Sequence, residues 1–256
     1  MKLNTIYNEN CLDTMQRMQD NFIDLTVTSP PYDNLRTYKG YSFNFESIAK
    51  ELYRVTKEGG VLVWIVGDSK SEGSRTLTHL KQALYFKEIG FNIHDIMIWQ
   101  KLNAMPYILK NCYTPSYEFM IICSKGKPKT TNIIEEKCKY AGQIISSSTN
   151  NKQSIRKNKF TLKTKDTKIK SNVWQMNNSG TNYGHPAIFP EKLAANHIYS
   201  WSKENDLIYD CFMGSGTTAK AAHLQNRNWI GSEISKEYTD LANKRLEPYL
   251  TQTKLF

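Results

Sequence analysis

The stretch Phe22-Ile23-Asp24-Leu25-Thr26-Val27-Thr28-Ser29-Pro30-Pro31-Tyr32 decides the fold. Its first six residues form a short run rich in apolar and β-branched side chains, which is typical of a buried strand. The two consecutive prolines cannot continue a strand ladder because they lack N–H groups, so the chain must leave the sheet there. The sequence therefore predicts a strand of an α/β sheet that ends in a rigid corner, and ligands bind at such strand ends.

The corner Ser29-Pro30-Pro31-Tyr32 has a specific chemistry. Fixed φ angles and missing N–H groups let the Ser29 and Pro30 carbonyls point outward as hydrogen-bond acceptors, and the Tyr32 ring offers a stacking surface beside them. Acceptors next to an aromatic face suit a flat group that carries an exocyclic NH2. Taken alone, these residues fit an ordinary proline-rich loop equally well.

A glycine turn near the other end of the chain supplies a second motif. Residues 206–210 read as a strand, Phe212-Met213-Gly214-Ser215-Gly216 as a tight turn, and 217–224 as a helix. Glycines permit close approach of a ligand to the backbone, and a helix N-terminus offers free N–H groups. The next predicted strand, 228–233, ends in Glu233, whose carboxylate can accept both ribose hydroxyls of an adenosine. A glycine turn by itself is shared by many nucleotide-binding proteins.

The rest of the chain alternates helix and strand patterns. Apolar spacing predicts helices over 12–18, 45–55, 77–89 and 236–250, with Gly59-Gly60 ending the second of them. The run 61–66 is apolar throughout, as in a strand buried on both faces of a parallel sheet. Residues 3–7, 92–100 and 117–124 are further strand candidates, and the last two predict an antiparallel edge.

Together, the two motifs resemble those of the DNA amino-methyltransferases, which transfer a methyl group from S-adenosylmethionine to the exocyclic nitrogen of cytosine or adenine. Ser29–Tyr32 matches the catalytic (S/D/N)PPY motif of that family, and Phe212–Gly216 matches its F-x-G-x-G cofactor loop. The catalytic motif precedes the cofactor motif, which is the permuted order of the family's β group. The resemblance implies a Rossmann-like fold with a seven-stranded, mostly parallel sheet and helices on both faces.

The resemblance also implies roles for individual residues. Ser29, Pro30, Pro31 and Tyr32 form the catalytic motif. Cofactor contacts are expected from Asp210, Phe212, Gly214, Gly216, Thr217, Glu233, Phe189, Pro190 and Cys11. Phe189 and Pro190 belong to the segment that packs against the methionine part of the cofactor in the family. Cys11 matches a segment near the adenine, although a lone cysteine is more often small core filler.

The target base is expected to be cytosine. Serine in the first motif position, with Thr28 before it, resembles the enzymes that methylate N4 of cytosine, whereas aspartate is usual in those that methylate N6 of adenine. In either case the nucleotide must rotate out of the duplex before its amine can react. Adenine remains the alternative target.

Positive charge is concentrated in one segment. Residues 125–170 hold 13 Lys/Arg against 3 Asp/Glu, while the rest of the chain holds 21 of each, so the whole net charge of +10 lies there. Such a block predicts a polyanionic partner, and double-stranded DNA is the obvious one. A solvated, lysine-rich disordered insert is the alternative. The expected DNA-binding residues are Arg36, Lys39, Lys152, Arg156, Lys157 and Lys159.

This distribution divides the chain into a catalytic half (1–124), a basic target-recognition insert (125–172) and a cofactor-binding half (173–256). The five cysteines are scattered, so neither a metal site nor a disulfide framework is expected. No apolar run approaches membrane-spanning length and no leader is evident, so we expect a soluble, cytoplasmic protein without membrane contact.

Competing functions are a methyltransferase acting on RNA or protein, and a DNA-binding relative that has lost catalysis. The size of the charged insert favours duplex DNA, and the presence of both motifs and Glu233 favours an active enzyme. Many members of the family belong to restriction-modification systems, which implies a cognate restriction endonuclease as a partner. The sequence leaves a monomer and a homodimer open.

Overall fold

The computed structural model describes residues 1–31, 43–105, 112–148, 159–178 and 189–251. The chain forms two compact units. The larger unit comprises Met1–Asn132 and Asn172–Phe256, and the smaller one comprises Ile133–Ser171. The smaller unit lies within the segment 125–172 that stands out by its charge.

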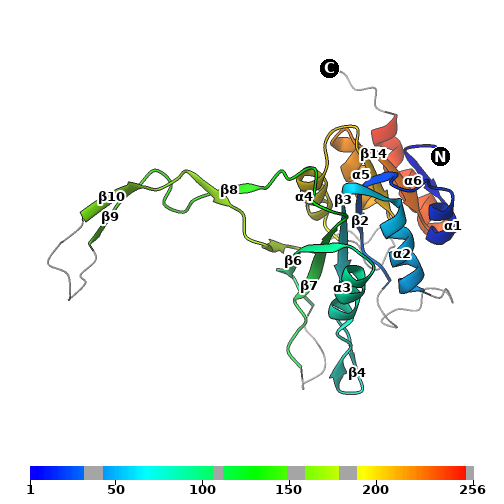
Figure 1. Ribbon diagram of the computed structural model, residues 1–256, viewed down its shortest axis with the longest axis horizontal. Coiled ribbons are helices and arrows are strands. Elements are labelled where there is room, and N and C mark those ends of the chain that lie inside the picture. The colour runs from blue at the N-terminus through cyan, green and yellow to red at the C-terminus, as the bar shows by residue number, and fades with distance from the viewer. Residues whose placement is uncertain (32–42, 106–111, 149–158, 179–188, 252–256) are drawn as a thin grey trace. The chain divides into compact units, whose positions relative to one another are not determined.

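The larger unit is built on an eight-stranded sheet (Figure 1). Every strand except β7 runs in the same direction. In spatial order the strands are β1 (Thr5–Tyr7), β14 (Asn228–Ser232), β13 (Leu207–Asp210), β2 (Ile23–Thr28), β3 (Thr56–Val66), β7 (Tyr117–Ser124), β6 (Asn92–Lys101) and β12 (Val173–Met176).

The predicted Rossmann-like α/β fold is confirmed, but the sheet has one strand more than the seven expected. The additional strand is β12, which pairs in parallel with β6 through Trp174 opposite Trp99. Strands β6 and β7 are antiparallel as predicted. They do not form the edge of the sheet, because β12 covers the outer side of β6.

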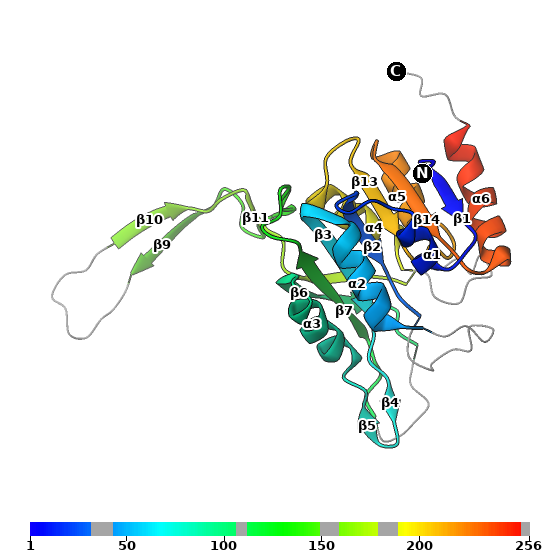
Figure 2. The ribbon, with the colours of Figure 1, turned by 45° about the vertical axis from the view of Figure 1, so that its right-hand side comes forward.

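Six helices are present in the described residues, and they cover both faces of the sheet (Figures 1 and 2). Helices α2 and α3 lie on one face and α4 and α5 on the other; α1 packs against α2, and α6 packs against α5. Their bounds are α1 (Cys11–Gln16), α2 (Phe45–Val55), α3 (Thr78–Glu88), α4 (Glu191–Trp201), α5 (Thr217–Leu224) and α6 (Lys236–Leu250).

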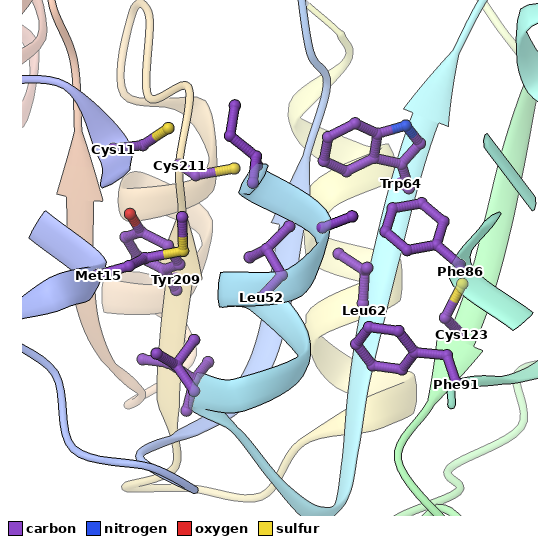
Figure 3. Close-up of a cluster of buried hydrophobic side chains, with 14 of the residues drawn as sticks. Cys11, Met15, Leu52, Leu62, Trp64, Phe86, Phe91, Cys123, Tyr209 and Cys211 are labelled. Carbon is purple, nitrogen blue, oxygen red and sulfur yellow. The ribbon is translucent and has the colours of Figure 1, made fainter. Parts of the chain in front are cut away.

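The main hydrophobic cluster lies between the sheet and α1, α2 and α3 (Figure 3). Helix α2 buries the side chains that recur at helical spacing, including Ile48, Leu52 and Val55. They pack in the same cluster as Leu62 and Trp64 of β3. Strand β2 is buried along its whole length, so it is a central strand, as the apolar run 22–27 predicts.

Strand β3 is longer than predicted. It begins at Thr56, directly after α2, and runs through Gly59 and Gly60 instead of starting after them. Gly59 adopts φ +76°, and a Cβ on Gly60 would lie 2.8 Å from the Lys57 carbonyl oxygen. The glycines therefore allow an irregular start of the strand in crowded surroundings, and they do not end the preceding helix.

Short antiparallel ribbons complete the structure. Strands β4 (Lys70–Ser71) and β5 (Ser74–Arg75) form a small hairpin in the larger unit. In the smaller unit, β8 (Glu135–Lys137) pairs with β11 (Thr167–Ile169), and β9 (Ile144–Ser148) pairs with β10 (Lys159–Lys163). None of these short strands was predicted from the sequence.

None of the helices that the structure describes is both long and apolar enough to span a membrane. Within the same residues, no group of three or more His, Cys, Asp or Glu side chains is arranged to hold a metal ion.

Candidate active site

The two sequence motifs follow neighbouring strands of the sheet. Strand β2 pairs in parallel with β13, with Leu25 opposite Ile208 and Thr26 opposite Tyr209. Parallel neighbours end at the same edge of the sheet, so the corner that follows β2 and the turn that follows β13 begin side by side. Residues 182 positions apart are thereby brought into direct contact, because Thr28 Oγ1 donates a hydrogen bond of 2.6 Å to Asp210 Oδ1.

Asp210 links the two motifs from a buried position. The same Oδ1 atom accepts a second hydrogen bond, of 3.0 Å, from the Phe212 N–H group. Burial raises the pKa of Asp210, and hydrogen bonds from the Thr28 and Thr218 hydroxyls and from Phe212 oppose that rise. The carboxyl group therefore holds the end of β2 against the start of the glycine turn.

The glycine turn adopts the backbone conformation that its residues predict. Gly214 and Gly216 have φ values of +51° and +80°, which lie in the left-handed region where glycine is favoured. The Met213 N–H group donates to the Ser232 carbonyl at the end of β14, and Gly216 N–H donates to Met213 O. Helix α5 begins immediately afterwards at Thr217, with no side-chain cap from Gly216. The first turn of α5 therefore offers backbone donors at the edge of the sheet.

Glu233 follows β14, the next strand along the sheet, and its side chain reaches back to the glycine turn. Its Oε2 atom accepts a hydrogen bond of 2.8 Å from Gly214 N–H, and Oε1 accepts one of 2.8 Å from Ser235 N–H. Burial raises the pKa of Glu233, and these two backbone donors oppose the rise. Each carboxylate oxygen has a further lone pair, so the group retains the capacity to accept two hydroxyl donors.

Phe212 closes one side of the turn with its ring. The ring packs edge-on against Phe43, with centroids 5.8 Å apart, and against Trp64 of β3 at 6.1 Å. Trp64 is itself fixed by a 2.8 Å hydrogen bond from its Nε1 to Gln82 of α3. An aromatic wall thus connects the glycine turn to the strand on the other side of β2.

Cys11 lies at the start of α1, near the end of β1. It is buried in the hydrophobic cluster, and Figure 3 shows it beside Cys211 and close to Tyr209. Burial raises the pKa of the Cys11 thiol to about 12, and the charge of Glu233 contributes to the rise. The thiol is thus a small, neutral side chain at the start of α1.

Phe189 and Pro190 precede α4 on the other face of the sheet. Phe189 is half-buried, and Pro190 is buried and occupies the N-cap position. Helix α4 buries Leu193, Ala194, His197, Ile198 and Trp201, which recur at helical spacing and form one apolar face. Burial lowers the pKa of His197 to about 3, so this histidine is neutral and belongs to the core.

The comparison with protein families decides the identity of this arrangement. Residues 23–244 match the family described as DNA methylase. The chain belongs to this family. Its catalytic-first motif order places it in the β group, and S-adenosylmethionine is the methyl donor of these methylases.

Individual relatives agree with this membership. The orphan methyltransferase M.BamHII of Bacillus amyloliquefaciens is 51% identical over 247 residues, which cover 92% of each chain. The type II methyltransferase M.BglII of Bacillus subtilis is 28% identical, with coverage of 94% of this chain and 68% of the relative.

Two solved structures show the same fold. The PvuII cytosine-N4-specific DNA methyltransferase matches with a TM-score of 0.71 at 22% identity, over 98% of this chain and 87% of the other. M1.HpyAVI in complex with S-adenosylmethionine matches with a TM-score of 0.63 at 23% identity, over 94% and 98%.

The structure of the methylase brings together part of the predicted site. Ser29, Pro30 and Pro31 follow β2, next to Asp210, Phe212, Gly214, Gly216 and Thr217 after β13 and Glu233 after β14. Cys11 lies at the start of α1, buried in the hydrophobic cluster. Tyr32 lies outside the described residues, so the predicted pocket shared by Tyr32 and Phe212 stays a prediction.

The DNA-binding residues of the methylase stay predictions for the same reason. Arg36, Lys39, Lys152, Arg156 and Lys157 lie outside the described residues. The backbone of Lys159 is described, as the first residue of β10, but its side chain is not.

Sequence reasoning missed two residues that shape the site. The role of Thr28 depends on the register between β2 and β13, which no local pattern reveals. Arg245 of α6 donates hydrogen bonds to Ser215 and Thr217 of the glycine turn. In the sequence, Arg245 stands out only because it lies between the apolar residues of α6. Other cations of the helix have similar positions, so this pattern does not identify it.

Proposed function

We propose that this methylase transfers a methyl group from S-adenosylmethionine to the exocyclic N4 of cytosine in double-stranded DNA. The observation that carries the proposal is the contact between the two motifs, made by the hydrogen bond from Thr28 to Asp210 at adjoining strand ends. A ligand held by the glycine turn would face a ligand held by the Ser-Pro-Pro-Tyr corner across this edge.

The residues of the β13–β14 edge fit the cofactor. Glu233 retains acceptor capacity for the two ribose hydroxyls, and the start of α5 offers N–H donors. Phe212, Phe189, Pro190 and Cys11 supply apolar surface, and Gly214, Gly216, Asp210 and Thr217 define the turn. S-adenosylmethionine supplies an electrophilic methyl group on a sulfonium. The chain's own task is to hold that group at the end of β2 and to keep it oriented.

The Ser29-Pro30 corner would act on the target amine. The lone pair of a cytosine N4 is delocalised into the ring, which makes the amine a poor nucleophile. Hydrogen bonds from the NH2 group to the Ser29 side chain and the Pro30 carbonyl would favour a pyramidal nitrogen and stabilise its developing positive charge. Tyr32 would stack on the extruded base. Alignment of both reactants supplies much of the remaining rate.

Cytosine is proposed over adenine because of Ser29. A serine hydroxyl can both accept and donate, whereas the aspartate usual in adenine-specific members only accepts when ionised. Methylation of N6 of adenine is the second candidate, and it uses the same edge of the sheet.

The smaller unit is proposed to bind the DNA duplex. Its described residues form two antiparallel ribbons, β8–β11 and β9–β10, in the segment that holds the excess of lysine. A two-stranded ribbon fits the major groove, and lysines neutralise phosphates. A cognate restriction endonuclease, a homodimer and a cytoplasmic location stay predictions; a relative at 51% identity is described as an orphan methyltransferase.

The direct test is to incubate the purified protein with plasmid DNA and methyl-labelled S-adenosylmethionine, and then to analyse the nucleosides by mass spectrometry. N4-methylcytosine supports the proposal, and N6-methyladenine supports the second candidate. Binding of DNA in a gel shift without label transfer would instead indicate an inactive relative.

The assignment of the corner has its own test. We expect Ser29→Ala and Tyr32→Ala to lower kcat strongly and to leave the affinity for S-adenosylmethionine near that of the wild type, because both residues would act on the base. A calorimetric titration in which loss of cofactor affinity is the main defect would contradict this placement.

A further inference from the structure

Three charged side chains from three helices meet behind the glycine turn. Glu191 is the first residue of α4, Lys220 lies in α5 and Arg245 lies in α6. Glu191 Oε1 accepts a hydrogen bond of 2.9 Å from Lys220 Nζ and one of 2.5 Å from Arg245 Nη2. The cluster thus ties the start of α4 to the middle of α5 and to α6.

Arg245 extends this cluster into the turn itself. Its Nη1 atom donates to Ser215 O at 3.0 Å, to Ser215 Oγ at 3.0 Å and to Thr217 Oγ1 at 3.2 Å. The two nitrogens of one guanidinium therefore hold different partners, the glycine turn on one side and Glu191 on the other. The Arg245 side chain is only 10% exposed, so solvent screens these bonds less than it would on the open surface.

The packing of α6 makes the Arg245 contact specific to the turn. A Cβ atom on Gly216 would lie 3.2 Å from Ala242 Cβ and 3.4 Å from Leu246 Cδ1, so α6 lies directly against the turn. Arg245 stands between those two residues in the sequence. The helix that forms the rear wall of the turn therefore also supplies its hydrogen-bond donor.

The contact between Arg245 and Glu191 joins the glycine turn to a second segment that is expected to bind the cofactor. Glu191 follows Phe189 and Pro190, which are expected to contact the methionine part of the cofactor. Partial burial alone would raise the pKa of Glu191, but the hydrogen bonds from Lys220 and Arg245 hold it below the ordinary value. Glu191 is thus an ionised anchor at neutral pH, and it fixes the start of α4 to Arg245.

We propose that Arg245 is a positioning residue for the cofactor: it holds the glycine turn and the Phe189-Pro190 segment at a fixed separation by binding Ser215 and Thr217 with one nitrogen and Glu191 with the other. The inference rests on the proposed cofactor site. Arg245 binds the glycine turn and Glu191, so its contribution concerns cofactor affinity and not the transfer step. A lysine cannot replace it fully, because a single ammonium lacks the planar fork that reaches both partners.

The test compares Arg245→Met, Arg245→Lys and Glu191→Gln with the wild type and with Lys236→Met. Lys236 is the matched control because it is a cation of the same helix in an ion pair, with Asp240, but its side chain is 71% exposed. Calorimetry gives the affinity for S-adenosylhomocysteine, and steady-state kinetics with plasmid DNA give kcat and both KM values.

Loss of the charge-assisted bonds should weaken cofactor affinity about ten- to a hundredfold in Arg245→Met. The KM for S-adenosylmethionine should rise in parallel, while kcat at saturating cofactor and the KM for DNA stay within about twofold. Arg245→Lys should lose less. In a double variant, Glu191→Gln should add less than its separate effect, since both changes break one unit.

Several outcomes would overturn the inference. One is unchanged cofactor affinity in Arg245→Met despite a lower melting temperature, since Arg245 would then serve stability alone. Another is equal loss in Lys236→Met. If Arg245→Met does not fold, the Arg245→Lys and Glu191→Gln affinities decide the question by the same criteria. Failure of the wild type to bind cofactor or to methylate DNA would instead refute the proposed function.

Discussion

Asp24 is a buried carboxylate with several hydrogen-bond donors around it. It is buried in β2 and accepts hydrogen bonds from Lys129 Nζ at 2.5 Å, Lys57 Nζ at 2.7 Å and Leu207 N–H at 3.0 Å. Burial alone would raise the pKa of Asp24, but these donors hold it below the ordinary value. One carboxylate thus binds two lysines and the first residue of β13.

The folded-state pKa of Asp24 is lower than the unfolded one, so its contribution to stability is present above the unfolded value of about 3.9 and is lost as the pH falls through the folded value. We expect Asp24→Asn to reduce the free energy of unfolding at pH 7 by about 1–3 kcal/mol, because Lys57 and Lys129 lose a charge-assisted acceptor but are themselves 36% and 43% exposed. The variant should also show a flatter acid limb. Urea denaturation between about pH 2 and pH 7 measures both effects.

The control is Asp20→Asn. Asp20 pairs with Arg54 but is 70% exposed, so its loss should cost at most about 1 kcal/mol. A similar loss in both variants would show that the burial of Asp24 is irrelevant.

Thr28 and Thr26 offer a matched comparison within β2. Both side chains are buried, but only the Thr28 hydroxyl donates to Asp210; the Thr26 hydroxyl finds no hydrogen-bond partner in the part of the chain that is described. Thr28→Val should therefore lower the free energy of unfolding by about 1–3 kcal/mol, whereas Thr26→Val should be neutral or stabilising. Equal effects in a denaturant titration would contradict the link between the two motifs.

The helices and long strands show how far the sequence alone leads. Helices α2 and α6 begin and end where apolar spacing predicts, because each buries one face over several turns, and α5 has the bounds predicted for the helix after the glycine turn. Strand β12 was missed because four residues carry too little periodicity. A pair of glycines usually marks the end of an element, but β3 continues through Gly59 and Gly60. The close packing of these glycines against Lys129 and Asp24 explains the exception.

The candidate active site shows the same division between what local sequence patterns predict and what only the fold reveals. The roles of motif residues such as Ser29, Gly214 and Glu233 can be predicted from residue type and local sequence. The bonds made by Thr28 and Arg245 depend on strand register and helix packing across distant parts of the chain. Local patterns do not contain that information, so these residues emerge only from the fold.

The turn between β13 and α5 permits a prediction at the level of the element. Gly216→Ala places a Cβ 3.2 Å from Ala242 at a φ of +80°, so both backbone strain and a clash with α6 are expected. The variant should lose more than the cost of about 1–2 kcal/mol for a left-handed alanine, and its affinity for S-adenosylhomocysteine should fall.

Gly73→Ala isolates the strain. Gly73 has a φ of +83°, and a Cβ there would meet no atom within 4 Å. Calorimetric melting of the two variants separates the backbone cost from the cost of displacing α6. If both lose the same stability, the packing of α6 on the turn contributes nothing.

For the molecule as a whole, the excess positive charge lies in the smaller unit and the proposed catalytic site in the larger one. Substitutions in the smaller unit should therefore change DNA binding and not cofactor binding. Lys163 and Lys165 are exposed residues of the smaller unit. Replacement of both by glutamine should weaken DNA binding and reduce the slope of log K against log salt by about 0.9 for each phosphate that is no longer neutralised. Cofactor affinity should not change. Fluorescence anisotropy with labelled duplex over a salt series measures the slope.

Replacement of Lys236 and Lys244 on α6 by glutamine makes the same change in net charge in the larger unit, and it should leave the slope as in the wild type. Equal slopes in the two double variants would refute the assignment of DNA binding to the smaller unit.

The pairing of β8 with β11 has a consequence for evolution. Glu135 pairs with Ile169, so the two ends of the smaller unit lie side by side in one antiparallel pair of strands. A segment with adjacent ends can be replaced by the corresponding segment of a related protein without a change in the strand order of the sheet. If the smaller unit selects the target as proposed, such an exchange would change which DNA sites are methylated and leave the larger unit intact.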